Sequence, residues 1–252
     1  MDLNKKLSQQ EQDYYTRQLM LKDFGAESQI KLKESSILLI GVGGVGSPVA
    51  TYLTGLGIGS LTIVDDDIVS FSNLHRQVLF DIDSIGEFKA TIAKNKLEKL
   101  NPYVQIDTIT DRLTLENASN FDIHKFDLII DTSDNFETKI LSNKLSIANK
   151  VTLLSGGVQG FNFQIGIFNI NNHTACLNCL YPEMNQLTNS ERVGVLGVTA
   201  GLEGMMLVNI ATNFLLNKNE FLDSTLYTYD LRKIELKKYS LVKNKDCGLC
   251  LL

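Results

Sequence analysis

The sequence predicts an α/β protein with a mostly parallel sheet that is covered by helices. Three observations support this fold class. Apolar, strand-like runs alternate with helical stretches over the first 155 residues. A glycine cluster directly follows the first of these runs. The chain of 252 residues is 44% hydrophobic and 21% charged, which is the balance of a globular protein with its own core.

The expected elements follow one another in a regular order. A helix over Tyr14–Leu21 comes after a polar start, and a strand over Ser36–Ile40 runs into the glycine cluster. A helix over Ser47–Leu56 and a strand over Leu61–Val64, ending on Asp65, complete a strand, helix, strand unit. The later segments are expected in this order: helix Lys89–Leu100, closed by Asn101-Pro102; strand Phe126–Ile130, ending on Asp131; helix Asn135–Asn149; and strand Val151–Leu154.

The second half of the chain differs in character. No Asp, Glu, Lys or Arg occurs from Val151 to Pro182, which predicts a face that is buried or covered by a partner. Phe163–Phe168 alternates as a strand does. Two short strand-like runs, Thr225–Asp230 and Lys233–Lys238, predict a C-terminal antiparallel extension.

Charge and hydropathy exclude several classes of partner. With 24 Lys+Arg against 29 Asp+Glu the net charge is −5, and no basic run is present, so nucleic acid is not expected as a partner. The start of the chain lacks an apolar core with a cleavage site, which predicts a cytoplasmic protein without a signal peptide. The apolar stretch Val193–Leu216 contains Glu203, Asn209 and Asn213, which favours a buried helix over a membrane span.

A glycine-rich loop is the first functional signal. Gly41, Gly43 and Gly46, with Gly44 between them, satisfy G-x-G-x-x-G between a strand and a helix, as in a Rossmann-like nucleotide site. Glycines let the backbone approach a phosphate, and the helix N-terminus attracts its charge. Asp65 ends the next strand, where a carboxylate can bind ribose hydroxyls. The motif alone leaves open ATP, a ligand-free tight turn, or a dinucleotide, so an NAD-dependent oxidoreductase is the first alternative.

Charged side chains near this loop favour group transfer. Arginine is scarce, with five against 19 lysines, so Arg17 and Arg76 stand out. Arg76 lies at the expected carboxyl edge of the sheet, Lys89 begins the next helix, and Asp134 follows a strand, where it could hold Mg²⁺. A nucleotidyl transfer site needs such charges, whereas a hydride-transfer site has little use for them. Taken singly, Arg76 and Lys89 could be solvated surface charges and Asp134 a helix N-cap.

The four cysteines form two C-x-x-C pairs, Cys176 with Cys179 and Cys247 with Cys250, 68 residues apart. Four thiolates can close a tetrahedral zinc site, which would pin the C-terminal tail to the first pair. Disulfides are disfavoured in the cytoplasm. Redox use and an iron–sulfur cluster remain alternatives. His173 is near the first pair but is not expected to be a ligand, because four sulfurs suffice.

The order and spacing of these motifs resemble the MoeB/ThiF family, bacterial relatives of ubiquitin-activating enzymes. The resemblance extends from about Tyr14 to Cys250. It implies an ATP-dependent adenylyltransferase that activates the C-terminal glycine of a ubiquitin-like sulfur-carrier protein, MoaD-like or ThiS-like, for molybdopterin or thiamine biosynthesis. The motifs that carry it are R-Q at 17–18, GVGGVG at 41–46, DDDIVSFSNLHRQ at 65–77, Gly86 to Lys89, DTSDN at 131–135 and the two C-x-x-C pairs.

By this resemblance one site holds ATP with Mg²⁺. Asp65 would bind the ribose, Asp134 would lie at the metal, and Arg17 would reach across a homodimer into the partner's nucleotide site. The carrier's terminal carboxylate would attack the α-phosphorus and expel pyrophosphate. The implied catalytic residues are Arg76, Lys89, Asp134 and Arg17. The implied nucleotide contacts are Gly41, Gly43, Gly44, Gly46, Asp65, Ser72, Asn73, Arg76, Lys89, Asp134 and Asn135.

The resemblance also implies one domain over residues 1–252, with a nucleotide-binding part at about 14–155 and an interface, zinc and carrier-binding part at about 156–252. Some family members carry a cysteine after the first C-x-x-C that accepts the carboxyl group or sulfur, but Tyr181–Gly201 contains none. The acyl-adenylate would then pass to an external sulfur donor, which favours a MoeB-like role over a ThiF-like one. Enzymes that adenylate a peptide or tRNA, and a catalytically silent nucleotide-binding module of this fold, are further alternatives.

Overall fold

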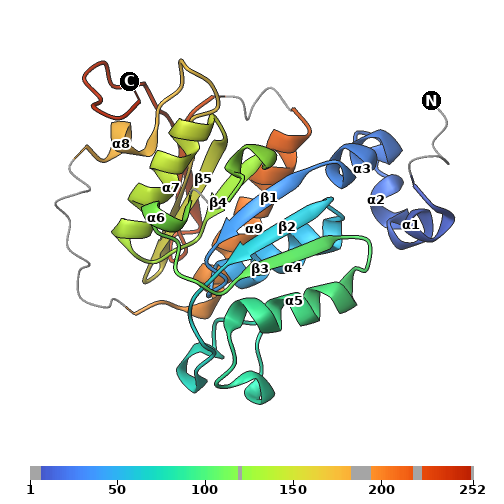
Figure 1. Ribbon diagram of the computed structural model, residues 1–252. Coiled ribbons are helices and arrows are strands. Elements are labelled where there is room, and N and C mark those ends of the chain that lie inside the picture. The colour runs from blue at the N-terminus through green and yellow to red at the C-terminus, as the bar shows by residue number, and fades with distance from the viewer. Residues whose placement is uncertain (1–6, 119–120, 183–193, 218–222, 251–252) are drawn as a thin grey trace.

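The computed structural model describes residues 7–118, 121–182, 194–217 and 223–250. Its frame is one eight-stranded sheet in the order β3-β2-β1-β4-β5-β6-β7-β8, part of which is labelled in Figure 1. The strands are β1 (Ser36–Ile40), β2 (Ser60–Val64), β3 (Gln105–Ile109), β4 (Leu128–Asp131), β5 (Thr152–Gln159), β6 (Asn162–Phe168), β7 (Thr225–Asp230) and β8 (Glu235–Ser240). The helices are α1 (Gln9–Tyr14), α2 (Thr16–Leu19), α3 (Gly25–Lys33), α4 (Gly46–Leu56), α5 (Lys89–Leu100), α6 (Leu115–Ala118), α7 (Phe136–Asn149), α8 (Leu177–Leu180) and α9 (Gly197–Leu215), with 3₁₀ turns η2 (Phe71–Asn73), η3 (Ile82–Ser84) and η4 (Ile123–Lys125).

Five neighbouring strands are parallel, which confirms the predicted sheet. β1 pairs with β2 and β4, β2 pairs with β3, and β4 pairs with β5. The chain passes from β1 out to β2 and β3 and then returns to β4 on the other side of β1, so the strand order reverses between β1 and β4. In open α/β sheets, ligands bind beyond the carboxyl ends of the strands at such a reversal.

Three antiparallel strands extend the same sheet, which confirms the predicted C-terminal extension. β5 pairs with β6, β6 with β7, and β7 with β8. β7 has the predicted bounds, but β8 begins at Glu235 rather than at Lys233. The reason is a turn, because the Asp230 Oδ1 atom accepts hydrogen bonds from the backbone amides of Arg232 (3.0 Å) and Lys233 (3.2 Å).

The uncharged stretch between Val151 and Pro182 supplies the centre of this sheet. Leu153 faces the cluster that includes α7, whereas Leu154 and Ile165 face the cluster that includes α9, and all three are fully buried. Both faces of the sheet are covered from Thr152 to Ser155 and from Ile165 to Phe168, which explains why no charged residue occurs there, whereas Gln159, Asn162 and Gln164 are exposed and polar. The prediction of a buried face is therefore confirmed for these two strands.

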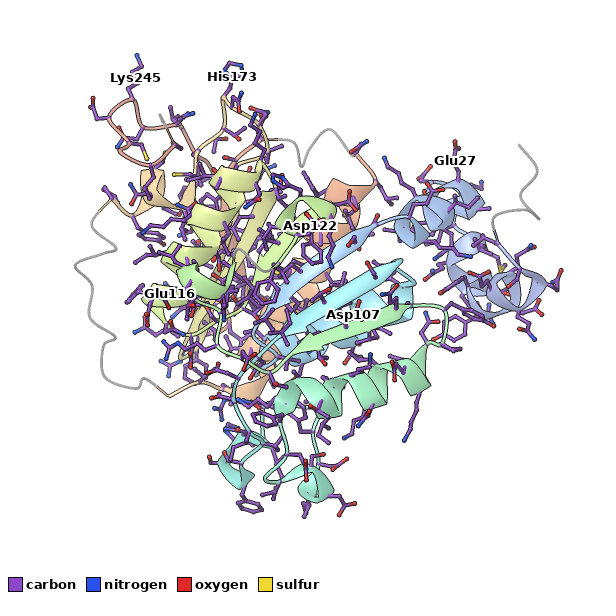
Figure 2. The ribbon with its side chains drawn as sticks, in the orientation of Figure 1. Glu27, Asp107, Glu116, Asp122, His173 and Lys245 are labelled. Atoms are coloured by element: carbon purple, nitrogen blue, oxygen red, sulfur yellow. The ribbon has the colours of Figure 1, made fainter. Side chains whose placement is uncertain are left out.

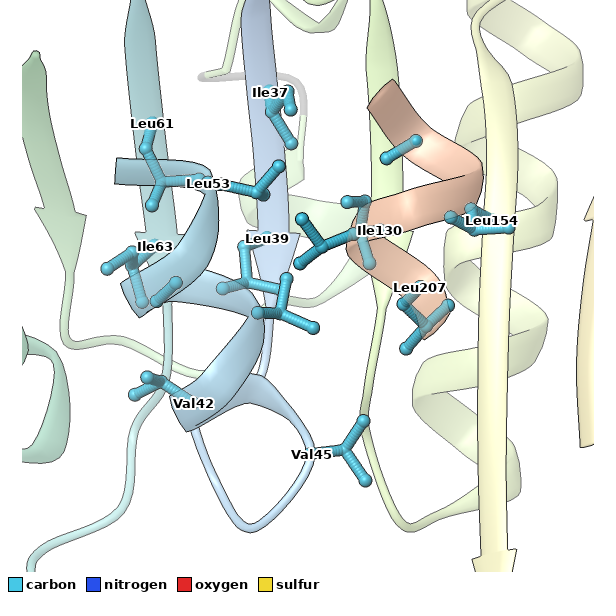
Figure 3. Close-up of a cluster of buried hydrophobic side chains, with 14 of the residues drawn as sticks. Ile37, Leu39, Val42, Val45, Leu53, Leu61, Ile63, Ile130, Leu154 and Leu207 are labelled. Carbon is cyan, nitrogen blue, oxygen red and sulfur yellow. The ribbon is translucent and has the colours of Figure 1, made fainter. Parts of the chain in front are cut away.

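The larger core cluster lies between the sheet and the pair α4 and α9. Figure 3 shows Leu39, Leu53, Ile130, Leu154 and Leu207 meeting in it. Within the described ranges α9 is the one helix long and apolar enough to cross a membrane by length and composition. It packs against α4, β5 and β6, which confirms the predicted buried helix, although residue 193 lies outside the described part.

Besides the start of β8, other predicted boundaries are wrong, among them the end of β5, which continues to Gln159 rather than ending at Leu154. Two more have a local cause. The helix expected over Tyr14–Leu21 is two short helices that meet at Tyr15, whose ring is 3% exposed and whose hydroxyl accepts a hydrogen bond from the Asn101 Nδ2 atom (2.9 Å). β4 begins two residues later than predicted. The reason is that the Asp127 side chain binds the start of β1, accepting from the Ser36 amide at 2.8 Å.

Candidate nucleotide site and cysteine cluster

The glycine-rich loop joins β1 to α4 and needs glycine at two of its positions. Gly41 has a φ of +86°, which side chains rarely adopt. A Cβ atom on Gly46 would lie 2.2 Å from the Gly41 carbonyl oxygen. α4 then begins without a side-chain cap on Val45. The Ser47 amide donates to the Gly43 carbonyl (2.9 Å) and Pro48 has no amide hydrogen, so the amides left for another acceptor are those of the loop that leads into the helix. The loop therefore has the geometry of an anion site at a helix N-terminus.

Asp65 ties this loop to the end of β2. Its Oδ2 atom accepts from the Val42 amide (2.7 Å) and its Oδ1 atom accepts from the Asp67 amide (3.0 Å). Burial raises the pKa of Asp65 above its ordinary value, and these amides and the Lys89 charge oppose that rise. The carboxylate retains free lone pairs for a ribose hydroxyl, as the sequence predicts.

Arg76 lies directly over the glycine loop. Its Cγ atom is 3.4 Å from the place that a Gly44 Cβ atom would take. Its Nη1 atom donates to the Ser72 carbonyl (3.0 Å) and lies 2.9 Å from the His75 Nε2 atom. Asn73 shapes the same turn by accepting from the Ser70 amide at 3.3 Å. Of the predicted residues in the loop after β2, Arg76 is thus brought to the glycine loop, and it connects Ser72 to it through the Ser72 carbonyl.

Lys89 is a buried cation rather than a solvated one, so the surface alternative is wrong for this residue. Its side chain is 5% exposed, and its Nζ atom pairs with the Asp67 Oδ2 atom at 2.7 Å. Asp67 is itself 71% exposed in its side chain. Since Asp67 follows Asp65 closely and the Lys89 charge acts on Asp65, Lys89 lies beside Asp65 in the candidate site.

The turn after β4 packs against the glycine loop from the other side. The Thr132 hydroxyl donates to the Gly41 carbonyl at 2.8 Å. Asn135 is the N-cap of α7 and accepts from the Thr138 amide at 2.9 Å, so the alternative that Asp134 caps this helix is wrong. Asp134 is exposed, and within the described ranges no hydrogen bond or ion pair involves it. Its carboxylate is available to a cation.

Arg17 is the one predicted catalytic residue that lies far from this cluster. It is exposed on α2. The neighbouring Gln18 side chain donates to the Leu56 carbonyl (3.0 Å) at the C-terminal end of α4, whereas the glycine loop lies at the N-terminal end. α4 has 11 residues and is therefore roughly 16 Å long. Arg17 is not brought together with the other site residues of its own chain.

Several buried polar groups near the loop were not predicted as site residues. Gln77, Thr199 and Glu203 are each at most 4% exposed and each has a side-chain oxygen without a hydrogen-bond partner among the described residues. Gln77 faces Gly43, with its Nε2 atom 3.6 Å from the position of a Cβ there. The one sequence signal was Glu203, a charge inside an otherwise apolar stretch.

The four cysteines form a compact cluster, as their spacing predicts. Their sulfur atoms all lie within 4.8 Å of one another. Cys176 Sγ is 3.7 Å from both Cys179 Sγ and Cys247 Sγ, and Cys179 Sγ is 3.5 Å from Cys250 Sγ. A tetrahedral metal with bonds of about 2.3 Å to sulfur places the sulfurs about 3.8 Å apart. All four are free thiols, so the disulfide alternative is wrong, and the set fits a tetrahedral ion.

The cluster connects the C-terminal tail to the segment after β6. The tail is held further by the Lys243 Nζ atom, which donates to the Asn172 carbonyl at 2.8 Å. In Figure 2 His173 and Lys245 extend from this same end of the molecule, and His173 is exposed. His173 is not in the cluster, which agrees with its exclusion as a ligand.

The fold and the site together define a Rossmann-like nucleotide-binding enzyme core. A cluster of four thiols attaches the C-terminal tail to this core. The model of the ThiF family matches residues 15–249. The chain is 34% identical to the sulfur carrier protein adenylyltransferase of Thermus thermophilus, over 96% of this chain and 92% of that one. The chain belongs to the ThiF family, and it is an enzyme of the nucleotidyltransferase class.

Other relatives are longer. The adenylyltransferase and sulfurtransferase UBA4 of Scheffersomyces stipitis is 39% identical over 94% of this chain but 55% of its own, so the chain spans about half the length of that relative. Among solved structures, Escherichia coli MccB with MccA-N7isoASN has a TM-score of 0.82 at 18% identity, over 97% of this chain and 76% of that one. MccB with ATP has a TM-score of 0.78 at 19% identity, over 89% and 69%. These likenesses establish the same fold.

Proposed function

We propose that this enzyme uses Mg-ATP to adenylate the C-terminal glycine of a ubiquitin-like sulfur-carrier protein, for molybdopterin or thiamine biosynthesis. The observation that carries the proposal is the convergence of the glycine loop, Arg76, Lys89 and the unpaired Asp134 where the strand order reverses. The names of the relatives supply the class of substrate. A cytoplasmic location fits this chemistry, because thiols stay reduced there.

The position of each residue in the site determines its proposed role in binding or catalysis. The amides of the glycine loop and of the α4 N-terminus hold phosphate oxygens, and Asp65 accepts from the ribose hydroxyls. Asp134, with Asn135 beside it, would hold Mg²⁺, which neutralises phosphate charge when bound. A carboxylate oxygen of the carrier attacks the α-phosphorus, the bond to the bridging oxygen of the β-phosphate breaks, and pyrophosphate leaves. Arg76 and Lys89 stabilise the charge on the phosphates during this displacement.

The direct test is carrier-dependent exchange of pyrophosphate into ATP, measured with purified MoaD-like and ThiS-like proteins. Exchange that requires one carrier supports the proposal and identifies the pathway. Bound ATP without exchange for any carrier, peptide or tRNA would favour a silent module. Oxidation of NADH without exchange would favour the oxidoreductase, which the family relationship already disfavours.

The cysteine cluster is proposed to hold structural Zn²⁺ rather than to react. The spacing of the sulfurs suits a closed tetrahedral site, and Cys176 and Cys247 are 0% and 2% exposed. A closed four-thiolate site has no open coordination position for a substrate. An external sulfur donor would then complete the pathway after adenylation.

This proposal predicts that no covalent adduct forms between the enzyme and the carrier. Incubation with Mg-ATP and carrier should give a carrier adenylate that remains bound without a covalent bond, because all four cysteines of the chain are committed to metal. Denaturing electrophoresis without reductant, followed by mass spectrometry, measures this. A thiol-labile adduct mapped to Cys179 or Cys250 would contradict both the zinc assignment and the MoeB-like role.

We also propose that the enzyme is a homodimer in which Arg17 serves the partner's site. An apolar groove of about 370 Å³ lies beside α2, between α4 and α9. Leu21, Tyr52 and Met205 line it and are 58%, 52% and 42% exposed. A surface of this kind favours burial against another protein. A second copy of the chain that packs on this groove would place its own α2, with Arg17, at the interface between the two subunits.

Mixed dimers test the role of Arg17. Arg17→Ala and Arg76→Ala subunits should each be inactive as homodimers, but their mixture should regain part of the exchange activity. The reason is that a hybrid dimer retains one site with both arginines if Arg17 acts across the interface. Differently tagged subunits, purified in tandem, provide a verified hybrid for the assay. An inactive hybrid would mean that Arg17 acts within its own chain, whereas a fully active Arg17→Ala homodimer would mean that Arg17 has no role.

A further inference from the structure

Three ionisable side chains from three elements meet beneath the candidate site. Lys139, on α7, has a side chain that is 13% exposed. Its Nζ atom donates to the Gly156 carbonyl at 2.6 Å, reaches the Ser155 hydroxyl at 3.5 Å, and lies 3.8 Å from the Asp131 Oδ1 atom. Asp131 ends β4 and is fully buried. The ammonium group thus connects the carboxyl end of β4 with the middle of β5.

Glu203 approaches the same place from α9, on the opposite face of the sheet. It is fully buried, and within the described residues no side chain donates a hydrogen bond to either of its carboxyl oxygens. Gly156 makes room for it, since a Cβ atom there would lie 2.5 Å from the Glu203 Oε1 atom. Burial raises the pKa of Glu203 to about 8, while the Lys139 charge and the Gly157 amide act in the opposite direction.

With Asp131 and Lys139 ionised, the charges of this cluster balance only while Glu203 is protonated. Asp131 and Lys139 neutralise each other while Glu203 is protonated. Loss of the Glu203 proton leaves two buried carboxylates and one ammonium group, so both acids then compete for Lys139. Asp131 also has an oxygen, Oδ2, without a hydrogen-bond partner among the described residues. The negative charge of Asp131 is therefore compensated by Lys139.

Other titratable groups do not face Glu203 from the elements packed around it. α4, β5 and β6 carry no acidic, basic or histidine side chain in their described spans. α3 also packs against α9 and carries Glu27, Lys31 and Lys33, but the groove beside it runs along Val208 and Thr212, about one and a half to two and a half helical turns beyond Glu203. Asp131 and Lys139 are thus the charged groups that respond to Glu203.

The cluster is connected directly to the turn that carries Asp134. The Asp131 Oδ1 atom accepts from the Ser133 amide (2.9 Å) and from the Ser133 hydroxyl (2.6 Å). The Ser133 amide nitrogen in turn lies 3.4 Å from the Cβ position of Gly41. Any shift of Asp131 is therefore transmitted to the Thr132–Asn135 turn and to the glycine loop that it touches.

We propose that Lys139 is a positioning residue of the nucleotide site, and that the protonation of Glu203 controls it. With neutral Glu203, Lys139 holds Asp131 and so fixes the turn that presents Asp134 to the metal. With ionised Glu203, the ammonium group is drawn toward α9 and the turn loosens. The inference rests on the proposed function only in taking Mg-ATP as the ligand of the glycine loop.

Calorimetric titration of the full chain with Mg-ATP, without carrier, tests the role of Glu203. The dissociation constant of the wild type should rise by about tenfold between pH 7 and pH 9.5, the effect of coupling to one pKa unit. Glu203→Gln should show no such rise, because an amide cannot ionise. A flat profile in the wild type, or the same rise in Glu203→Gln, overturns the inference while leaving the adenylation proposal intact. Absence of Mg-ATP binding at every pH would instead overturn the proposed function.

A second comparison separates positioning from a general structural role. Lys139→Met should weaken Mg-ATP binding by about tenfold but leave the binding of ATP without added Mg²⁺ nearly unchanged, because this residue is proposed to present Asp134 to the metal. Lys144→Met on the same helix is the matched control and should change neither. Equal losses with and without Mg²⁺ would overturn the proposal. If Lys139→Met does not fold, Lys139→Arg, which keeps the charge, should retain Mg-dependent binding, and its loss would count equally against the proposal.

Discussion

Replacing either Arg76 or Lys89 with alanine is expected to lower carrier-dependent ATP–pyrophosphate exchange by roughly 10² or more. Each supplies a fixed positive charge at a site where phosphate charge must be stabilised, and loss of one preorganised contact has an effect of this order. Steady-state exchange at saturating Mg-ATP measures it. Asp134→Ala should have a similar effect, because its carboxylate is the unpaired one at the metal position.

The fold should survive these changes. Arg76 contacts the Ser72 backbone and His75, and the partner of Lys89 is the largely exposed Asp67, so removing either cation strands no buried charge. Lys99→Ala is the matched control, since Lys99 is exposed in the last turn of the helix that Lys89 begins. Near-normal exchange in Arg76→Ala or Lys89→Ala would remove the proposed role of that residue.

Replacing Cys247 with serine is expected to abolish tight zinc binding and to lower the thermal stability of the protein strongly. A structural Zn²⁺ in a four-ligand site contributes an apparent binding free energy of about 10–16 kcal/mol, which the unfolded chain cannot collect. The wild type should contain one zinc per chain by elemental analysis. Thermal unfolding of Cys247→Ser and Cys250→Ser measures the loss.

A chelator provides the control for this experiment. It should lower the unfolding temperature of the wild type toward that of Cys247→Ser and leave the variant unchanged, because both treatments remove the same metal. Carefully reduced protein without zinc would contradict the assignment. Iron with a visible absorption band would instead indicate a cluster cofactor.

The parallel core was predictable because its signals are local. The strand before Gly41 and the helix after Gly46 identify themselves by an apolar run, glycines and a following amphipathic stretch. β3 was not predicted. Its sequence, Gln105–Ile109, alternates polar and apolar residues weakly because it is an edge strand with little burial on one face. Its pairing with β2 decides its conformation.

The candidate site likewise has a part that could be predicted from the sequence and a part that could not. Its glycines, Asp65 and Asp134 belong to short sequence motifs, so each of them can be recognised from the residues next to it in the chain. The cluster of Lys139, Asp131 and Glu203 could not be read from sequence, because its members come from α7, β4 and α9 and meet only when the sheet is covered on both faces. Lys139 looks in sequence like any solvated helix lysine.

The cysteine cluster has a consequence for the order of biosynthesis. Its first pair follows β6, but its second pair follows β8, so in chain order all eight strands precede the last two sulfurs. A ribosome makes them in that order, and the metal can be enclosed only after the whole sheet has been synthesised. Binding of the proposed zinc would thus distinguish chains that have reached Cys250 from interrupted ones, in which Cys176 and Cys179 would lack their partners.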